Sequence, residues 1–251
     1  MTSAPPSPAK HLPVYACVKT HEQAARIFAR WPREGRVLEV AAGSGAFARR
    51  LVGLGFSVEA CDLYPEEFRV PEVHCRYADL SDRLPYPDAS FEYLACLEGI
   101  EHLEDQFTFV RECARVLKPG GRLLLSTPNV LGLASRWRYF WTGFFPLAVR
   151  PLNEHHRRPV HDHIHLISYH QLRYVLRTTG FTIEAVTTDR IRKYGLVLAW
   201  AWPVVQLATR RVLARESDPR QREANREIAA HMLGPALLFG RTLLLTARKS
   251  A

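Results

Sequence analysis

The stretch VLEVAAGSGAFARRL, Val37–Leu51, decides the fold. It begins as a short apolar run, passes an acid and two closely spaced glycines, and continues with apolar residues at helical spacing. Gly43, Gly45 and Ala48 form a loose G-x-G-x-x-A pattern. A strand that enters a helix through such a turn is typical of nucleotide-binding α/β proteins, because glycines let the backbone approach the ligand. The stretch therefore predicts a nucleotide-like ligand at this turn.

Strands and helices are expected to alternate outward from this stretch. Near-continuous apolar runs predict strands at 36–41, 57–61, 73–77, 91–97, 122–127, 181–187 and 241–248. The clearest helix is predicted over 104–117, where KPGG would stop it with a lysine in the last turn and a glycine beyond. Apolar strands separated by helices predict an α/β protein with a Rossmann-like, seven-stranded, mostly parallel sheet and helices on both faces.

The length of 251 residues suits one large domain. We expect a short disordered tail over 1–12, rich in proline and small residues, and a single domain over 13–251. Long stretches between predicted strands indicate insertions at about 129–160 and 190–239. The five cysteines lack C-x-x-C spacing, and no apolar leader precedes the domain, so we expect a cytoplasmic protein with reduced thiols.

The net charge is +9, and most of the excess lies in the C-terminal half. Such a surface favours an anionic partner, either a phosphate-bearing acceptor or an acidic membrane surface. A nucleic-acid partner is not expected. The acceptor is expected to be a small molecule or a glycan-linked or lipid-linked compound.

Acids follow the ends of three predicted strands. Glu39 lies four residues before Gly43, where it would repel the pyrophosphate of NAD and attract a cation. S-adenosylmethionine carries an ammonium, a sulfonium and no phosphate, so Glu39 favours it over NAD. Asp62 ends the next strand at a distance suited to ribose hydroxyls, and Asp79 follows the third strand, where it could accept from an adenine amino group.

With these motifs the chain resembles the class I S-adenosylmethionine-dependent methyltransferases. The stretches VLEVAAGSGAFARRL, EACDLYPE, YADLSDRLPYPDASFEYLACLEGIEHLED and ECARVLKPGGRLLLSTPN match that family in order and spacing over about 35–187, and the match resumes at GRTLLLTARK. Phe91-Glu92 departs from the usual Phe-Asp. The resemblance implies an antiparallel last strand inserted beside the fifth. The expected cofactor-binding residues are Glu39, Gly43, Ser44, Gly45, Asp62, Leu63, Asp79 and Leu80.

LEGIEHLED places Glu98, Glu101 and His102 after the fourth strand. If a helix began there, these i, i+3 and i+4 residues would share one face and could hold a divalent ion. The E-x-x-E-H pattern resembles that of ubiquinone-biosynthesis O-methyltransferases and small-RNA 2′-O-methyltransferases, and in the latter a downstream histidine completes the site. His163 and His165 would serve here, with Mg, Mn, Fe or Zn as the ion. The alternative is a metal-free site.

Glu101 and His102 are the expected catalytic residues in either case, because both would face the acceptor. With a metal, they would hold the ion that lowers the pKa of the acceptor hydroxyl. Without one, His102 would act as base or orient the substrate.

YGLVLAWAWPVVQLATRR, 194–211, is apolar, flanked by arginines, and too short to span a membrane. Its tryptophans suit a bilayer interface, so 194–209 could lie on a membrane and bring the protein to its inner face. It could equally cover the substrate pocket or form a homodimer interface.

The expected function is O-methylation, by S-adenosylmethionine, of a hydroxyl on a glycan, a lipid-linked compound or a quinone-like phenol. Two alternatives stay open. A non-catalytic partner subunit would bind the cofactor without turnover, and an NAD(P)-dependent oxidoreductase would bind NAD(P) in its place.

Overall fold

The computed structural model describes residues 12–145, 152, 155 and 162–251. Within them, seven strands form one sheet in the order β3-β2-β1-β4-β5-β7-β6. The strands are β1 (Arg36–Val40), β2 (Ser57–Asp62), β3 (Cys75–Tyr77), β4 (Phe91–Leu97), β5 (Leu117–Pro128), β6 (Phe181–Thr188) and β7 (Thr242–Lys249). The expected tail over 1–12 lies, apart from Leu12, outside the described residues, as does much of the insertion at 129–160.

The strand pairing confirms the predicted fold class. β1 pairs in parallel with β2 and β4, β2 with β3, and β4 with β5. β7 is antiparallel to both β5 and β6 and lies between them. The seven expected strands are present, and β4 has the predicted bounds.

The predicted stop of the long helix at KPGG was wrong. The helix α3 (Gln106–Val116) ends before Leu117, which is extended and already pairs with Phe91. Lys118 to Gly121 therefore lie within β5, and the Lys118 ammonium forms an ion pair with Glu92. Leu117 pairs with Phe91 and Arg122 pairs with Tyr93, so 118–121 form an irregularity within β5 in place of the expected glycine cap.

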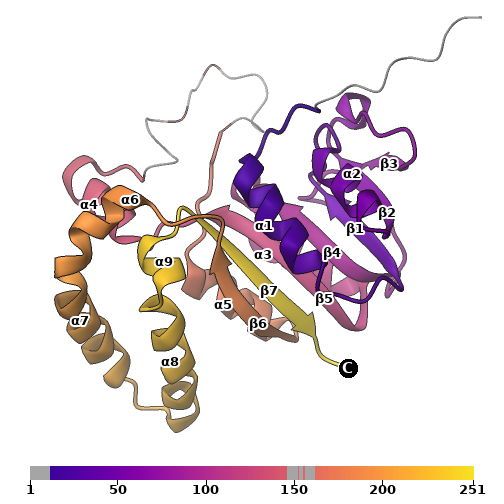
Figure 1. The fold of residues 1–251 in the computed structure, drawn as a ribbon. Coiled ribbons are helices and arrows are strands. Elements are labelled where there is room, and N and C mark those ends of the chain that lie inside the picture. Colours follow the sequence, from indigo (N-terminus) through magenta and orange to yellow (C-terminus); the bar gives the residue numbers. More distant parts are fainter. Residues whose placement is uncertain (1–11, 146–151, 153–154, 156–161) are drawn as a thin grey trace, which may run out of the picture.

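Helices cover both faces of the sheet (Figure 1). The helices α1 (Val18–Phe28) and α2 (Ala46–Gly53) pack on one face, while α3 and α5 (Tyr169–Thr178) pack on the other. Two single turns, η1 (Pro65–Glu67) and η2 (Ile100–His102), follow β2 and β4.

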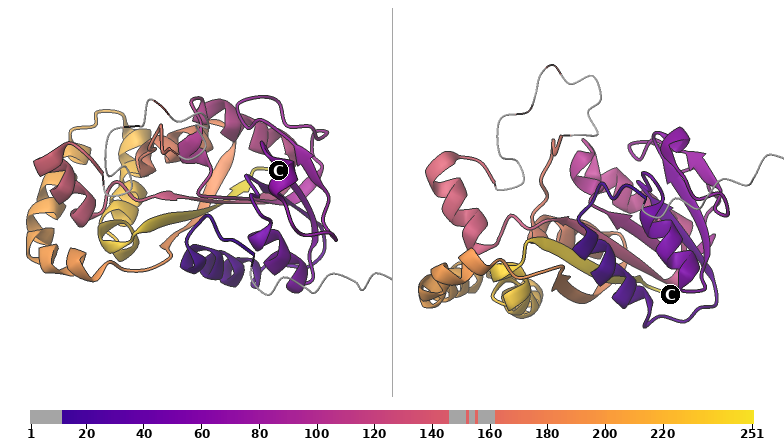
Figure 2. Two further views of the ribbon diagram at one scale, coloured as in Figure 1. Left: turned by 90° about the horizontal axis from the view of Figure 1, so that it is seen from above. Right: turned by 45° about the horizontal axis from the view of Figure 1, so that its top comes forward.

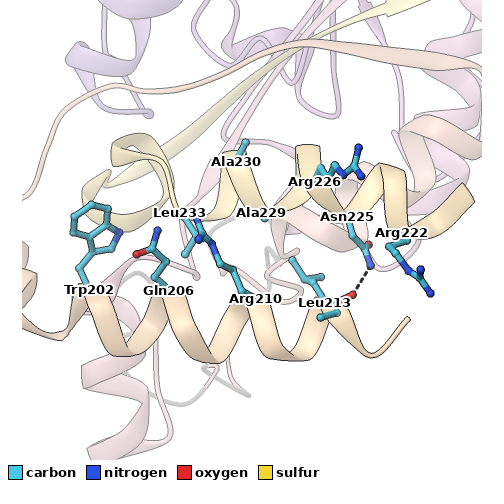
Figure 3. A pocket seen from close by; sticks show the side chains of 11 residues that line it. Trp202, Gln206, Arg210, Leu213, Arg222, Asn225, Arg226, Ala229, Ala230 and Leu233 are labelled. Atoms are coloured by element: carbon cyan, nitrogen blue, oxygen red, sulfur yellow. Dashed lines mark hydrogen bonds between the residues drawn. The ribbon is translucent and has the colours of Figure 1, made fainter. Parts of the chain in front are cut away.

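The remaining helices form a lobe to one side of the sheet, away from β3 in both views of Figure 2. This helical lobe consists of α4 (Leu133–Thr142), α6 (Lys193–Leu196), η4 (Val197–Ala201), α7 (Trp202–Ala214), α8 (Pro219–Met232) and α9 (Pro235–Phe239). α7 and α8 run side by side, and the Asn225 amide donates to the carbonyl oxygen of Leu213 at 3.1 Å (Figure 3). None of the described helices is both long enough and apolar enough to cross a membrane.

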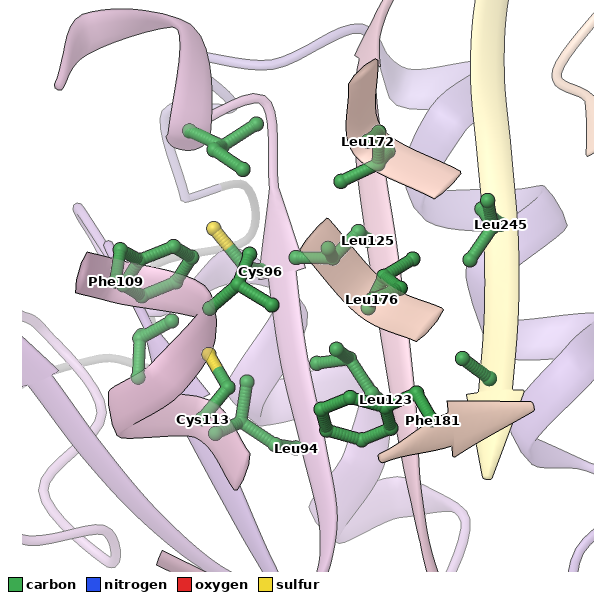
Figure 4. Close-up of a cluster of buried hydrophobic side chains, with 14 of the residues drawn as sticks. Leu94, Cys96, Phe109, Cys113, Leu123, Leu125, Leu172, Leu176, Phe181 and Leu245 are labelled. Atoms are coloured by element: carbon green, nitrogen blue, oxygen red, sulfur yellow. The ribbon is translucent and has the colours of Figure 1, made fainter. Parts of the chain in front are cut away.

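The larger core cluster lies between the sheet and α3 with α5. It includes Leu94 and Cys96 of β4, which point at Phe109 and Cys113 of α3 (Figure 4). Alternate residues of β4 turn to the opposite face, where Tyr93 and Ala95 pack with α1 and α2. Because the central strands are apolar on both faces, the sheet lies between two hydrophobic cores. The polar residues at the strand ends lie outside these cores and can form a site.

Candidate active site

The carboxyl ends of β1, β2 and β4 open into a cavity of about 560 Å³. The strand order reverses between β1 and β4, which is where open α/β sheets place their ligands. The structure brings most of the predicted residues to its walls: Glu39, Gly43, Ser44, Asp62, Leu63, Asp79, Leu80, Glu98, His102 and His163. Gly45, Glu101 and His165 are not among its lining residues.

The glycine turn joins β1 to α2 through two glycines in the left-handed region. Gly43 has φ +52° and Gly45 has φ +82°. A Cβ on Gly45 would lie 2.6 Å from the Val70 side chain and 2.7 Å from the Phe68 ring. Gly45 is therefore required by packing behind the turn, whereas Gly43 and Ser44 face the cavity.

Asp62 holds the turn from the end of β2. Its Oδ2 accepts from the Gly43 amide at 2.8 Å, and its Oδ1 accepts from the Tyr64 amide at 2.8 Å. The Gly45 amide donates to the Ala42 carbonyl at 2.9 Å. Both glycine amides are therefore used within the protein, whereas in a dinucleotide-binding turn the backbone amides point at a pyrophosphate.

Glu39 lies at the bottom of the cavity and is almost fully buried. Its Oε2 meets no hydrogen-bond partner among the described residues. Burial, with the neighbouring Asp62 carboxylate, holds the pKa of Glu39 well above its usual range. A cationic ligand in the cavity would reverse this effect and favour the carboxylate.

The walls of the cavity are acidic in a chain whose net charge is +9. Its carboxylate residues are Glu39, Asp62, Glu67, Asp79, Glu98 and Glu104, and none of the described lining residues is a lysine or an arginine. Such walls would repel the pyrophosphate of NAD(P) and attract a ligand with an ammonium and a sulfonium. The residues present therefore fit S-adenosylmethionine.

Sequence reasoning missed the residues that approach the turn from the N-terminal side. Pro13, Tyr15 and His21 line the cavity, and the Ser44 hydroxyl donates to the Pro13 carbonyl. The Tyr15 ring lies over the turn, since a Cβ on Gly43 would come within 2.9 Å of it. No motif marks these residues, and a proline-rich segment gives no periodicity that would have revealed them.

Glu98 does not join Glu101 and His102, so the predicted helical face was wrong. Glu98 has φ +51°, and the turn that follows is the 3₁₀ helix η2 rather than an α-helix. Its carboxylate accepts from the Cys17 amide at 3.3 Å, the Thr20 hydroxyl at 3.4 Å and the Thr242 hydroxyl at 3.2 Å. Glu98 thus links α1 and β7 to the end of β4.

Glu101, His102 and His163 do come together, with one donor atom of each lying within 4.8 Å of the others. Glu101 is fully buried, and neither of its carboxylate oxygens meets a hydrogen-bond partner among the described residues. Burial raises the pKa of Glu101 to about 8. The His102 Nδ1 lies 2.8 Å from the Asp162 carbonyl, and if it donates there, the lone pair of the neutral ring is on Nε2.

His165 lies outside this cluster, although its backbone helps to build it. The side chain is exposed, and its Nδ1 lies 3.2 Å from the Glu104 carbonyl. The His165 amide donates to the Glu101 carbonyl at 3.1 Å, and the Gln106 amide donates to the His165 carbonyl at 2.5 Å. These bonds fix the strand-like segment 162–167 beside η2 and so bring His163 to Glu101.

Comparison with known proteins agrees with this geometry. The family described as methyltransferase domain matches residues 10–186. A protein named as a probable S-adenosylmethionine-dependent methyltransferase of Mycolicibacterium smegmatis is 36% identical over 155 residues, which are 59% of this chain and 52% of the relative. A ubiquinone biosynthesis O-methyltransferase of Xanthomonas oryzae is 38% identical over 103 residues, or 38% of this chain and 43% of the relative. The chain spans about half the length of these curated relatives or less.

Solved structures share the fold at low identity. An S-adenosylmethionine-dependent methyltransferase from Archaeoglobus fulgidus superposes with a TM-score of 0.57 at 17% identity, covering 91% of this chain and 94% of that one. Another from Mesorhizobium loti gives 0.54 at 19% identity, covering 92% and 98%. Because the family model covers residues 10–186, the chain belongs to the methyltransferase domain family. Its fold is that of the class I enzymes, whose cofactor is S-adenosylmethionine.

Proposed function

We propose that this protein is an S-adenosylmethionine-dependent O-methyltransferase. The observation that carries the proposal is the cavity itself, which combines acidic walls for a cationic cofactor with a Glu101–His102–His163 cluster at one side, in which Glu101 is buried and both histidines are half-buried. The ubiquinone biosynthesis O-methyltransferases among the relatives support an oxygen acceptor. The proposed acceptor is a hydroxyl on a glycan, a lipid-linked compound or a quinone-like phenol.

Each wall of the cavity has a role in this proposal. Asp62 would accept from the ribose hydroxyls and Asp79 from the adenine amino group, with Leu63 and Leu80 packing beside the base. Gly43 and Ser44 would line the methionine end, where the buried Glu39 faces positive charge. When bound, S-adenosylmethionine supplies a methyl group on a positively charged sulfur.

His102 would act on the acceptor. Transfer breaks the bond from sulfur to the methyl carbon and forms a bond from that carbon to the acceptor oxygen, whose proton must leave. In a metal-free site, His102 with Nδ1 directed at the Asp162 carbonyl would present Nε2 as the base for that proton, whereas with a metal the same Nε2 would be a ligand. The cavity walls would hold the hydroxyl in line with the sulfonium, which is the main contribution that a protein makes to such a displacement.

A divalent ion is part of the proposal. Glu101, His102 and His163 would hold it, since one carboxylate and two imidazoles suit Mn, Fe or Zn, and Mg less well. The unpartnered oxygens of Glu101 support this, because a buried carboxyl group without a partner is costly unless a cation or a proton occupies it. The ion would supply a lower pKa for the acceptor hydroxyl.

Chelation and elemental analysis test the ion. We expect metal in the purified protein, loss of methyl transfer after chelation, and recovery when a single divalent ion is added. The variant His102→Ala should lose metal and turnover while keeping its affinity for S-adenosylhomocysteine. Full activity in exhaustively chelated, metal-free protein would exclude the ion and leave His102 as the base.

Calorimetry separates this function from the two alternatives. Binding of S-adenosylhomocysteine without binding of NAD would exclude the oxidoreductase, and the reverse result would overturn our proposal. Turnover with any catechol, phenol or glycan acceptor would exclude a non-catalytic subunit. A catechol that reacts faster than the matching phenol would support a metal that engages two neighbouring hydroxyls.

A further inference from the structure

The outside of the helical lobe carries an extended apolar surface. η4 and α7 contain no buried residue, although their sequence is largely apolar. The large side chains that they expose are Val197, Trp200, Trp202, Val204, Leu207 and Val212. Val197 is 74% exposed and Trp200 is 71% exposed, so these side chains are not part of the core of the chain.

α7 packs through one side only. Trp202, Gln206, Arg210 and Leu213 line a cavity of about 510 Å³ between α7 and α8 (Figure 3). At 100° per residue, Val204 and Arg211 lie on the opposite side of the helix, and Leu207 lies on its flank. We call Val197, Trp200, Val204 and Leu207 the outer face. Of these residues, Val204 lies on the side of α7 away from α8.

α4 adds aromatic residues to the same lobe. Its first turn is buried, but Trp137, Phe140 and Trp141 near its end are exposed. α4 contacts both α6 and η4, so its exposed aromatic residues and the outer face belong to the same lobe.

Within α4, η4 and α7 the charge has one sign, whereas α8 and the loop before it carry both signs. The segment 190–215 contains six arginines and lysines and no acid, and 129–145 contains two arginines and no acid. On the α8 side of α7, Arg210, Arg222 and Arg226 line the cavity behind the outer face (Figure 3). An apolar layer with tryptophans is therefore backed by arginines, of which Arg226 is paired with Glu223.

We propose that the outer face of the lobe docks on an anionic lipid surface. Val197, Trp200, Val204 and Leu207 enter the boundary between headgroups and acyl chains, with α7 lying in the plane of the interface. The arginines then meet lipid phosphates, each adding attraction to a negatively charged surface. Tryptophan suits this depth because its ring is apolar and its N–H is polar.

The charge decides between a lipid surface and a second copy of the chain. Two outer faces brought together would oppose arginines to arginines, without an acid in 190–215 to pair with them. An anionic bilayer supplies the missing negative charge over the whole surface. The docking surface lies away from the candidate active site, so the docking proposal can be tested independently of the proposed methyl transfer.

Flotation with vesicles tests the docking, with phosphatidylcholine vesicles that contain or lack phosphatidylglycerol as the probes. We expect the protein to float with the anionic vesicles and not with phosphatidylcholine alone. The double variant Val204→Glu/Leu207→Glu should bind at least about tenfold more weakly. Tyr77→Glu/Tyr174→Glu is the control, because it adds the same charge at equally exposed residues outside the lobe.

A second pair of variants tests the arginines. Arg211→Gln/Arg215→Gln should weaken binding to anionic vesicles, whereas Arg30→Gln/Arg111→Gln, with the same net charge, should not. Unchanged affinity for S-adenosylhomocysteine shows that each variant is folded. Equal flotation of Val204→Glu/Leu207→Glu and the parent would overturn the proposal. It would also be overturned if sedimentation showed that the parent is a dimer and that Val204→Glu/Leu207→Glu is a monomer.

Discussion

Asp62 holds the glycine turn and, in the proposed function, also binds the ligand. Its two carboxylate oxygens accept from the Gly43 and Tyr64 amides, which fixes the glycine turn and leaves the remaining lone pairs toward the cavity. A carboxylate has about four lone-pair sites, so it can hold the turn and still accept from a ribose.

Replacing Asp62 by alanine should weaken the binding of S-adenosylhomocysteine strongly. Two charge-assisted hydrogen bonds to the ribose would be lost, each worth roughly 1.5–3 kcal/mol, so Kd should rise by about a hundredfold or more. Calorimetry measures the change, and Asp82→Ala, at an exposed residue nearby, is the control. An unchanged Kd would remove Asp62 from the cofactor site.

His21 should make the stability of the protein depend on pH. Burial, with a contribution from Arg50, lowers the pKa of His21 to about 4, so the folded state holds a neutral ring. The unfolded state takes up the proton near 6.5. Stability is therefore fully present above about pH 6.5 and falls as the pH drops toward 4, by about 2 kcal/mol at about pH 5.

Denaturant unfolding at about pH 7.5 and about pH 5 measures this effect. His21→Gln should remove most of it, while His74→Gln, at an exposed residue, should retain it. If His21→Gln and the parent lose the same stability between the two pH values, the ring is not held neutral by its surroundings.

At the scale of elements, one asparagine holds the lobe to the sheet. The Asn129 amide, just past β5, donates to the carbonyls of Leu237 and Gly240, both at 2.9 Å. Its Oδ1 accepts from the Leu131 amide at 3.1 Å, and the residue is 5% exposed. The single side chain thus closes the end of α9 and the start of α4 at once.

Asn129→Ala should lower the free energy of unfolding by about 2–4 kcal/mol, because two buried carbonyls at the end of α9 lose their donor. Thermal and denaturant unfolding measure the loss. Gln206→Ala removes an amide from a partly exposed residue of α7 and should change stability by less than about 0.5 kcal/mol. Equal effects of the two substitutions would contradict this role for Asn129.

The elements that were predicted correctly from the sequence are those whose apolar pattern lies within the element itself. The strands of the sheet are largely continuous apolar runs, so their bounds were predicted to within two residues except for β5, which begins five residues before its predicted start. Glu39, Asp62 and Asp79 follow from the ends of those strands. Pairing across the sheet is not local, which is why the KPGG segment was assigned to a helix end and lies in β5.

The acceptor side of the site was predicted only in part for the same reason. Glu101, His102 and His163 meet because backbone bonds hold segment 162–167 beside η2, and one of the two expected histidines reaches the cluster while His165 does not. The residue Glu98 has the right type and spacing, but its positive φ turns the carboxylate toward α1 and β7. The spacing of residues in the sequence does not predict this positive φ, and so does not predict where the Glu98 carboxylate lies.

At the scale of the whole molecule, acidic and basic side chains gather in different regions. Carboxylates line the cavity at the ends of β1, β2 and β4, whereas arginines gather on the helical lobe. Because the cavity walls come from the sheet and from the segments around α1 and η2, we expect cofactor binding to be independent of η4 and α7.

Replacing 197–218, which covers η4 and α7, by a flexible Gly/Ser linker should therefore leave the core intact. Neither element contains a buried residue, and a linker of about 12 residues spans roughly 19 Å, close to the length of α7. We expect the Kd for S-adenosylhomocysteine to stay within about twofold of the parent, since no cavity residue is removed. Loss of cofactor binding in a folded variant would show that the lobe and the cavity are coupled.

The place of β7 has a consequence for the order in which the chain is made. β7 is the last strand in sequence, yet it lies between β5 and β6 and is the only strand paired with β6 in the described residues. During synthesis, β5 and β6 leave the ribosome with facing edges unpaired, and the lobe helices follow before β7 arrives. At about 5–20 residues per second, those edges stay open for several seconds. The nascent chain is therefore most prone to aggregate in this interval, which ends when β7 inserts between the two strands.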